Sequence, residues 1–206
     1  MGVDPQIDHL SVIKPDEMAA ALRHTSDLMP TRYFHQDGLI QAAVLIPFLW
    51  IDGAWHILFT RRTDHLETHK GQVAFPGGAV DPCDVDPGAT ALREAYEETG
   101  IQPGSVRLIG QMIDMVTITR FLVTPVVGVV EWPQSLNLAE FEVSRVFTVP
   151  LGWLADPENV EIKPYLRPNG HIEEVIYFNR YDGEMIWGVT GRIMYDLIQL
   201  LIRSQG

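Results

Sequence analysis

Three glutamates are the residues of this chain whose types and spacing most directly indicate chemistry. Glu94, Glu97 and Glu98 stand at positions i, i+3 and i+4, which puts their carboxylates on one face if the segment is helical. Three clustered anions repel one another, and a bound divalent cation removes that repulsion. Hard oxygen ligands suit Mg²⁺ or Mn²⁺ better than Zn²⁺. The spacing alone is therefore compatible with a metal site and, equally, with a solvated acidic helix face.

The segment that carries the glutamates has the composition of a helix. Alanine, leucine and tyrosine over residues 89–96 give it an apolar side, and Gly100 stands where a helix commonly ends in a left-handed residue. The pair Gly77-Gly78 precedes this helix and follows a short predicted strand over residues 72–75.

The full pattern resembles the Nudix box, G-x5-E-x7-R-E-U-x-E-E-x-G-U, in which U is an aliphatic residue. Gly78 supplies the glycine, and the run from Arg93 to Ile101 matches the second half. Two departures concern the first acid of the box. Asp84 stands in place of a glutamate, and eight residues rather than seven separate it from Arg93.

This resemblance implies a metal-dependent hydrolase of phosphoric anhydrides with Mg²⁺ or Mn²⁺ as cofactor. The implied metal ligands are the carboxylates of Glu94, Glu97 and Glu98 and the backbone carbonyl of Gly78. The same three glutamates and Arg93 make up the predicted catalytic set, in which a water of lowered pKa attacks one phosphorus.

The group that accepts the proton of that water is left open by the sequence. Glu97 and Glu98 are the favoured bases, and Glu142, in a predicted loop, is a further candidate for base or metal ligand. We expect Arg93 to pair with an acid such as Asp84 and to orient the box.

Residues 58–78, ahead of the box, resemble the signature of the coenzyme A diphosphatase branch of the Nudix family, L-L-T-x-R-x-x-x-L-R-x-H-x-G-Q-V-x-F-P-G-G. The matching positions are Arg61 or Arg62, Leu66, His69, Gly71, Gln72, Phe75 and Pro76. Glu67 stands where that branch has arginine, whereas the Asp84 variant and the longer box loop also occur there. The resemblance implies hydrolysis of coenzyme A or its thioesters to 4′-phosphopantetheine, free or acylated, and adenosine 3′,5′-bisphosphate.

A cationic patch adjoins the box in this acidic chain. Arg61, Arg62, His69 and Lys70 form it, and together with Gln72 they are the predicted substrate-binding residues, because a pyrophosphate needs cations around it. The alternative is that these are surface charges beside a strand and that the histidine is structural. Five aromatic residues could stack on an adenine ring, although we expect most of them in the core: Trp132, Trp153, Tyr165, Tyr177 and Trp187.

Two other functions remain as alternatives. The first keeps the chemistry and changes the substrate to ADP-ribose or another nucleoside diphosphate derivative. The second is a catalytically idle nucleotide-binding Nudix module, which the intact glutamate set disfavours.

The order of the predicted elements indicates an α+β domain with a Nudix-type α/β/α sandwich, a mixed β-sheet between helices. Residues 142–151 and 186–193 resemble two further segments of the coenzyme A branch, so the likeness runs from about residue 39 to residue 202. We predict an N-terminal helical extension over residues 1–38, packed on a Nudix hydrolase domain over residues 39–206. The predicted helices cover 15–29, the box segment, 150–154 and 190–202, and the predicted strands cover 39–50, 55–60, 72–75, 106–116, 121–130, 143–149, 172–178 and 185–187.

The composition of the chain limits the kinds of partner that it is expected to bind. A net charge of −12 argues against nucleic acid or an anionic membrane, both of which need clustered Lys and Arg. The single cysteine, Cys83, excludes an internal disulfide and favours a reducing compartment. With no targeting or membrane-spanning segment in the sequence, we expect a cytoplasmic protein with a small, coenzyme A-like nucleotide substrate. The family resemblance leaves a homodimer open.

Overall fold

The long strand β1 (Ile40–Ile51) is the centre of the protein. The computed structural model describes residues 5–26, 38–65, 70–166, 170 and 172–204. In it β1 pairs antiparallel with β2 (Ala54–Arg62) and parallel with β7 (Phe121–Val130), which makes the sheet mixed. The other strands of this sheet pair with these three: β3 (Val73–Ala74) and β8 (Val143–Pro150) with β2, β4 (Gly77–Ala79) with β1, and β5 (Val106–Gln111) and β6 (Met115–Val116) with β7.

Both faces of β1 are buried, which explains its almost continuous apolar sequence. Ala43 and Leu45 point to one face, where they pack against Ala91 and Ala95 of α3 (Pro87–Thr99). Their neighbours along the strand point to the opposite face and join a larger core. The box helix therefore lies flat on the middle of the sheet through small side chains, which let it approach closely.

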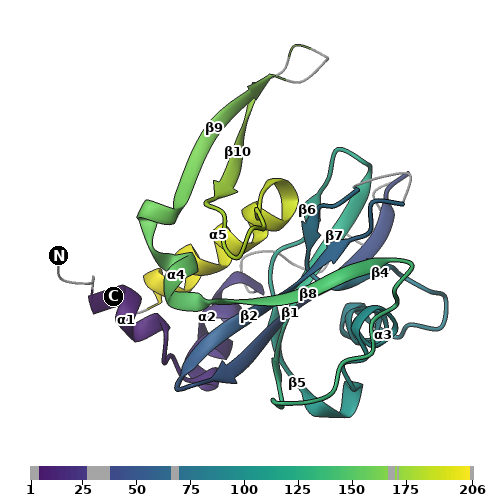
Figure 1. The fold of residues 1–206 in the computed structure, drawn as a ribbon, viewed down its shortest axis with the longest axis horizontal. Coiled ribbons are helices and arrows are strands. Elements are labelled where there is room, and N and C mark those ends of the chain that lie inside the picture. The colour runs from purple at the N-terminus through teal and green to yellow at the C-terminus, as the bar shows by residue number, and fades with distance from the viewer. Residues whose placement is uncertain (1–4, 27–37, 66–69, 167–169, 171, 205–206) are drawn as a thin grey trace.

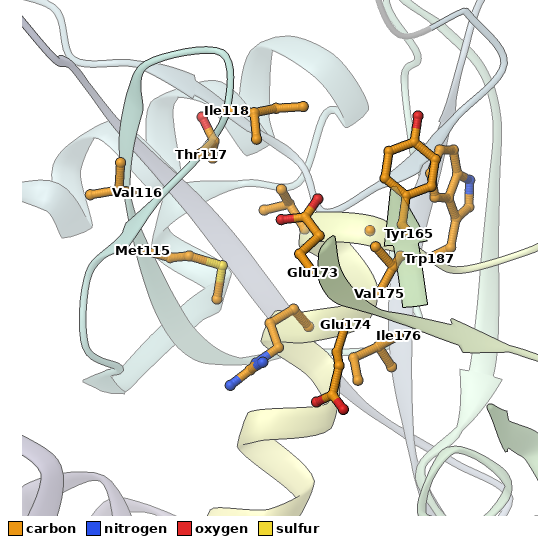
Figure 2. Close-up of a pocket in the computed structure, with 13 residues that line it drawn as sticks. Met115, Val116, Thr117, Ile118, Tyr165, Glu173, Glu174, Val175, Ile176 and Trp187 are labelled. Carbon is orange, nitrogen blue, oxygen red and sulfur yellow. The ribbon is translucent and has the colours of Figure 1, made fainter. Parts of the chain in front are cut away.

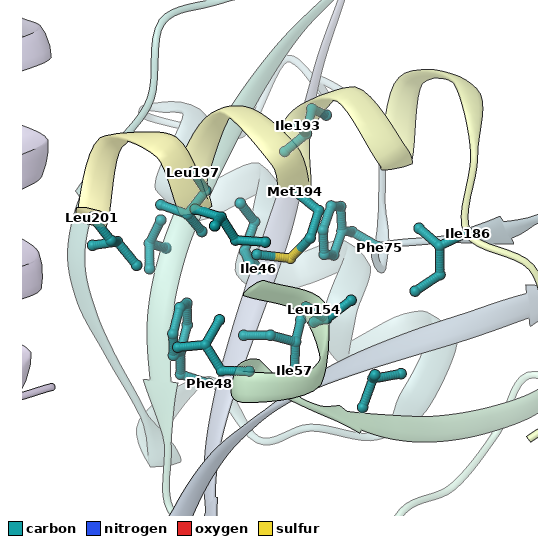
Figure 3. Packing of buried hydrophobic residues seen from close by; sticks show 14 of the residues in the cluster. Ile46, Phe48, Ile57, Phe75, Leu154, Ile186, Ile193, Met194, Leu197 and Leu201 are labelled. Carbon is teal, nitrogen blue, oxygen red and sulfur yellow. The ribbon is translucent and has the colours of Figure 1, made fainter. Parts of the chain in front are cut away.

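Four helices cover the opposite face, so the sheet lies between helical layers (Figure 1). They are α1 (Pro5–Leu10), α2 (Pro15–Ser26), α4 (Leu151–Ala155) and α5 (Gly188–Arg203). Figure 3 shows Met194 and Leu197 of α5 directed toward Ile46, Phe48 and Ile57 of the sheet. The predicted α+β sandwich is confirmed.

The turns and caps that sequence chemistry demands are present. Asp52 and Gly53 both have positive φ, 49° and 84°, as a tight two-residue hairpin between β1 and β2 requires. At the start of α3 the Asp86 carboxylate accepts a hydrogen bond from the Ala89 amide at 2.8 Å, and Gly100 ends the helix with φ 79°. Both ends of the box helix are therefore fixed.

Three of the differences between the predicted and the observed elements concern strands with a clear structural explanation. The predicted strand over 106–116 is divided into β5 and β6, because the chain leaves the ladder at Asp114, whose carboxylate accepts a hydrogen bond from Thr124 Oγ1 at 2.7 Å. The predicted strand over 185–187 contributes only a single bridge, between Tyr177 and Trp187. The unpredicted β9 (Val160–Leu166) forms a separate two-stranded ribbon with β10 (Ile172–Phe178) and is exposed along most of its length, so it lacks the alternation that reveals a strand.

The remaining short elements are the 3₁₀ turns η1 (Pro103–Ser105) and η2 (Pro157–Asn159) and the helix α1, which the sequence did not indicate. The predicted helix over 15–29 is observed to Ser26, and residues 27–29 lie outside the described residues. Leu10 and Leu22 of the first two helices are buried in the same core as α5. The domain boundary at residue 38 stays a prediction. Within the described ranges, no helix combines the length and the apolar character needed to cross a membrane.

Truncating the α5 contact should test this packing. Leu197 is fully buried, so Leu197→Ala should lower the free energy of unfolding by about 3 kcal/mol through lost burial and a residual cavity. Urea denaturation followed by circular dichroism measures the change. Leu166→Ala makes the same truncation at a side chain that is 65% exposed and should have an effect below about 0.5 kcal/mol. Equal losses in the two variants would contradict the assigned core.

Candidate active site

Glu98 is an ionisable side chain enclosed by the fold, with only 5% of its surface exposed. Its Oε1 lies 3.9 Å from Nη1 of Arg62 on β2, and the Gly77 amide donates a hydrogen bond to it. Its Oε2 is buried without a hydrogen-bond partner among the described residues. Burial raises the pKa of Glu98 to about 8, because desolvation outweighs the attraction of Arg62. Arg62 therefore offsets only part of the cost of burying this carboxylate.

Arg93 joins the loop of the box to helix α3 by donating hydrogen bonds through all five of its N–H groups. Nε and Nη2 donate to the two carboxylate oxygens of Asp84 at 3.1 and 2.9 Å. Nη1 donates to Glu94 at 2.7 Å and to Glu97 at 3.1 Å, and Nη2 also donates to the Ala79 carbonyl at 3.0 Å. With five donors occupied, Arg93 has none left for a substrate. The geometry favours the expected orienting role and includes the Asp84 pairing.

The aspartate at position 84 is buried and held by several hydrogen bonds. Its side chain is 6% exposed and also accepts a hydrogen bond from Thr90 Oγ1 at 2.9 Å, which ties the loop to the first turn of α3. The hydrogen bonds from Arg93 hold the pKa of the Asp84 carboxyl well below its usual range. The loop accommodates the eight-residue spacing. Both departures from the box therefore lie in the loop that leads into α3.

Glu94 lies against the glycine pair. A methyl group built at Gly78 would come within 2.5 Å of the Glu94 carboxylate, so only glycine leaves room for it. Burial raises the pKa of Glu94, and the bond from Arg93 opposes that shift. Glu97 is more exposed, with 55% of its side chain accessible. Glu142 is exposed in the loop before β8, and its charge acts on both Glu94 and Glu98.

The predicted substrate-binding residues divide into two groups. Arg62 faces Glu98, whereas Arg61 faces the turn at residues 181–184, where its Nε lies 3.6 Å from Glu184 Oε2. Lys70 and Gln72 line a cavity of about 520 Å³ together with Arg61, and Gln72 also lines a neighbouring cavity of about 330 Å³ with Arg62. His69 and Glu67 lie outside the described residues.

Of the five aromatic candidates, Trp187 borders both of these cavities. It is 37% exposed, and one face of its indole is stacked parallel on Tyr177 with ring centroids 5.8 Å apart. Trp153 packs edge-on against Tyr181, and Trp132 lies against a small core cluster. Tyr165, on the ribbon, borders a third cavity.

Apart from the binding and stacking candidates named above, the residues that line these cavities were not predicted from the sequence. Residues 115–118 of the β6 region, residues 187–190 at the start of α5 and the ribbon contribute many of them, and no spacing in the chain links segments so far apart. Arg145 and Arg180 also escaped notice, since each is an isolated cation in its own segment.

The NUDIX domain family matches residues 39–169. The chain belongs to the Nudix family. It is 38% identical over 161 residues to an uncharacterized Nudix hydrolase NudL of Enterobacter sp. (strain 638), which covers 76% of this chain and 80% of that protein. The NudL protein of Salmonella paratyphi B is 40% identical over 158 residues with the same coverage. The crystal structure of a MutT/nudix family protein from Enterococcus faecalis shares the fold, with a TM-score of 0.50 and 14% identity over 92% of this chain and 73% of that one.

The protein is therefore a Nudix hydrolase, an enzyme of a family that acts on phosphoric anhydrides and generally uses divalent metal ions. The family, the enzyme class and the fold predicted from the sequence are confirmed. The names of these relatives specify no substrate, so the coenzyme A branch and the choice of metal stay predictions.

The Nudix residues present fit a divalent metal ion in the chemistry of their donor atoms. Glu98 offers a buried oxygen without a partner, and Gly78 leaves room for Glu94 beside a backbone carbonyl. As the side chains stand, no three acidic, histidine or cysteine side chains in the described ranges enclose a common point. Arg93 holds Glu94 and Glu97, while Glu98 turns toward Arg62. The ligand set of Glu94, Glu97, Glu98 and Gly78 stays a prediction.

Gly78→Ala should weaken the proposed metal site while leaving the fold intact. The added methyl group meets the movable end of Glu94, so the chain should still fold, with a change of less than about 1 kcal/mol in the free energy of unfolding. Displacement of Glu94 should weaken Mn²⁺ binding, measured by calorimetry, by about tenfold to hundredfold. Gly104→Ala, where no atom lies within 4 Å of the new methyl group, is the control and should keep wild-type affinity. Wild-type Mn²⁺ affinity in Gly78→Ala would refute the assignment.

Asp84→Asn should destabilise the protein in a pH-dependent way. The amide NH₂ cannot accept from Arg93, so we expect a loss of about 2 kcal/mol at pH 7 in urea denaturation. The folded-state pKa of Asp84 lies below the unfolded value of about 3.9. The wild-type advantage is thus complete at neutral pH and shrinks as the pH falls below that value.

The control for this prediction is Asp16→Asn, at a carboxylate that is 96% exposed and 3.8 Å from Arg107. It should change stability by less than about 0.5 kcal/mol. An Asp84→Asn difference that is the same at pH 3 and pH 7 would contradict the proposed charge interaction.

Proposed function

We propose that this Nudix hydrolase cleaves the pyrophosphate bond of coenzyme A or its thioesters. The observation that carries the proposal is a largely apolar cavity whose lining includes Arg62, the residue that faces the buried Glu98 carboxylate. It has a volume of about 330 Å³, and Arg62 and Gln72 form its polar end. Val73, Val123 and Val189 are among the apolar side chains that line the rest. A pyrophosphate at the Arg62 end would thus have a space for a long uncharged group beside it.

The cavity continues toward the ribbon. A second space of about 320 Å³ shares its wall at Thr117, Ile118 and Trp187. Figure 2 shows Met115, Val116 and Ile118 on one side of it and Tyr165 and Trp187 on the other. The pantetheine arm of coenzyme A, alone or extended by an acyl chain, has the length and low charge that such a groove would accept. ADP-ribose would present a polar ribose to the same apolar walls.

The chemistry follows from the carboxylates. A divalent metal ion bound by Glu94, Glu97, Glu98 and the Gly78 carbonyl would supply an activated water and neutralise phosphate charge. Arg93 orients Glu94 and Glu97 through its hydrogen bonds to both. Arg62 stands at the junction of Glu98 and the groove, where it can bind a phosphate oxygen. Glu97 and Glu98 remain the proposed bases, with Glu142 as a further candidate that faces the same cluster.

The remaining expectations belong to the same proposal. Mg²⁺ or Mn²⁺ is the proposed cofactor, the substrate is a small nucleotide rather than nucleic acid or a membrane surface, and the location is cytoplasmic. A homodimer stays an open expectation.

Product identification tests the function. The chain is incubated with Mg²⁺ or Mn²⁺ and, separately, with coenzyme A, ADP-ribose or diadenosine polyphosphates, and the products are separated by chromatography. We expect adenosine 3′,5′-bisphosphate and 4′-phosphopantetheine from coenzyme A, formed faster than any product of the other compounds and abolished by a chelator. Faster release of AMP from ADP-ribose would favour the alternative substrate.

Glu97→Gln should lower turnover of coenzyme A by at least about 100-fold, because a carboxylate of the metal cluster is lost. Binding of coenzyme A, measured by calorimetry, should persist. Glu161→Gln, on the exposed strand β9, is the matched control and should keep wild-type turnover. If the wild type hydrolyses none of the three compounds in the presence of metal ions, the idle nucleotide-binding module is favoured.

A further inference from the structure

We propose that Lys70 and Arg180 form a second anion subsite, which binds a phosphate monoester remote from the anhydride that is cleaved. The inference deepens the proposed function and rests on it for the identity of the substrate. Lys70 was predicted to bind substrate, whereas no motif in the chain points to Arg180.

The subsite is a polar cavity of about 520 Å³ that adjoins the proposed catalytic groove. Lys70, Arg180 and Arg61 are among its lining residues. It shares Gln72 and Trp187 with the cavity in which Arg62 lies. A single ligand can therefore extend from Arg62 past Gln72 and Trp187 to Lys70 and Arg180.

The charges around the cavity leave two cations uncommitted. Arg61 is occupied by Asp64 at 3.3 Å and by Glu184 at 3.6 Å. In the described ranges, neither Lys70 nor Arg180 has an acidic partner, although the chain as a whole carries a net charge of −12. Glu184 also lines the cavity, but its ion pairs are with Arg61 and Arg145. Two cations without an acidic partner, in a chain rich in carboxylates, favour an anionic ligand at that place.

The two acids of the turn that follows Arg180, Asp182 and Glu184, are paired with other arginines. Arg145 on β8 pairs with the Asp182 carboxylate, donates to the Asp182 carbonyl at 3.1 Å, and donates to Glu184 at 3.3 Å. Glu184 is thus shared between Arg145 and Arg61. These pairs remove the competition that the two acids would otherwise offer to a phosphate at Arg180.

The turn that carries Arg180 is pre-organised. Tyr181 and Glu184 exchange two backbone hydrogen bonds of 3.0 Å, and Asp182 and Gly183 have the positive φ values, 51° and 81°, of a tight turn. Nη1 of Arg180 donates to the Gly183 carbonyl at 2.7 Å, which fixes the guanidinium and leaves other N–H groups for a ligand. A guanidinium held in this way loses little conformational entropy when it binds a phosphate.

A phosphate monoester fits this pair better than a diester does. A monoester carries up to two negative charges and three terminal oxygens, enough for a guanidinium and an ammonium at once. Coenzyme A carries such a group on the adenosine ribose, and ADP-ribose does not. The exposed face of Trp187, between the two cavities, is placed to stack on the base. The subsite would therefore select the 3′-phosphorylated nucleotide end.

Binding of two nucleotides that differ only in this group tests the subsite without turnover. Calorimetry with the 206-residue chain compares adenosine 3′,5′-bisphosphate with AMP. We expect the wild type to bind the bisphosphate about tenfold or more tightly, and Arg180→Ala and Lys70→Ala each to remove most of that difference. Arg107→Ala removes an arginine that is 59% exposed on β5 and should keep the full preference, which controls for net charge.

The outcomes separate the subsite from the proposed function. Equal wild-type affinity for the two nucleotides, or a preference that survives in both Arg180→Ala and Lys70→Ala, would overturn the subsite even if coenzyme A is cleaved. A preference that depends on these two residues supports it. If coenzyme A is then not cleaved, the proposed function fails while the phosphate subsite stands. Circular dichroism of each variant confirms that a lost preference does not reflect a lost fold.

Discussion

The five hydrogen bonds of Arg93 are the interaction on which the rest of the site depends. One guanidinium joins the loop after the glycine pair, through Asp84 and Ala79, to two glutamates on α3. Without that cation the Glu94 and Glu97 carboxylates would repel each other beside a third, buried one. The Arg93 guanidinium holds the loop and the helix at the same time. The position of Glu94 against Gly78 is therefore set by these hydrogen bonds rather than by a bound ligand.

The sheet adds a second constraint by bringing distant segments to one edge. Arg62 reaches Glu98 from β2, and β3 carries the chain past Gln72 into the groove wall. The two cavities that share Gln72 and Trp187 differ in character, since one is lined mainly by apolar side chains and the other has Arg61, Lys70 and Arg180 among its lining residues. A substrate with one uncharged end and one phosphorylated end matches that division. The proposed function depends on this polarity as well as on the box.

The sequence predicted those parts of the protein in which local chemistry and tertiary structure agree. The box helix was predictable because its alanines, Gly100 and its glutamates all indicate the same helix, and β7 was predictable because valine and other apolar residues dominate its sequence. The strand β9 was not, since both of its faces are largely exposed and no periodicity distinguishes it from a loop. The burial of Glu98 was also unpredictable, because nothing in its spacing separates it from the exposed Glu97. The groove and the Arg180 subsite depend on contacts between segments that only the fold brings together.

The ribbon of β9 and β10 has a consequence for how such an enzyme can change over evolution. Its two strands form a sheet of their own that projects from the rest of the domain (Figure 1), and Tyr177 adds one bridge to Trp187. The paired residues Leu166 and Ile172, at its outer end, are exposed. Tyr165 and Glu173, near that outer end, nevertheless form a wall of the second cavity (Figure 2). Under the proposed function, mutations in the ribbon can lengthen or shorten the accepted arm without passing through the central sheet. Substrate range and bond cleavage are then encoded in structurally separate parts of one domain, so selection can act on one while the other is conserved.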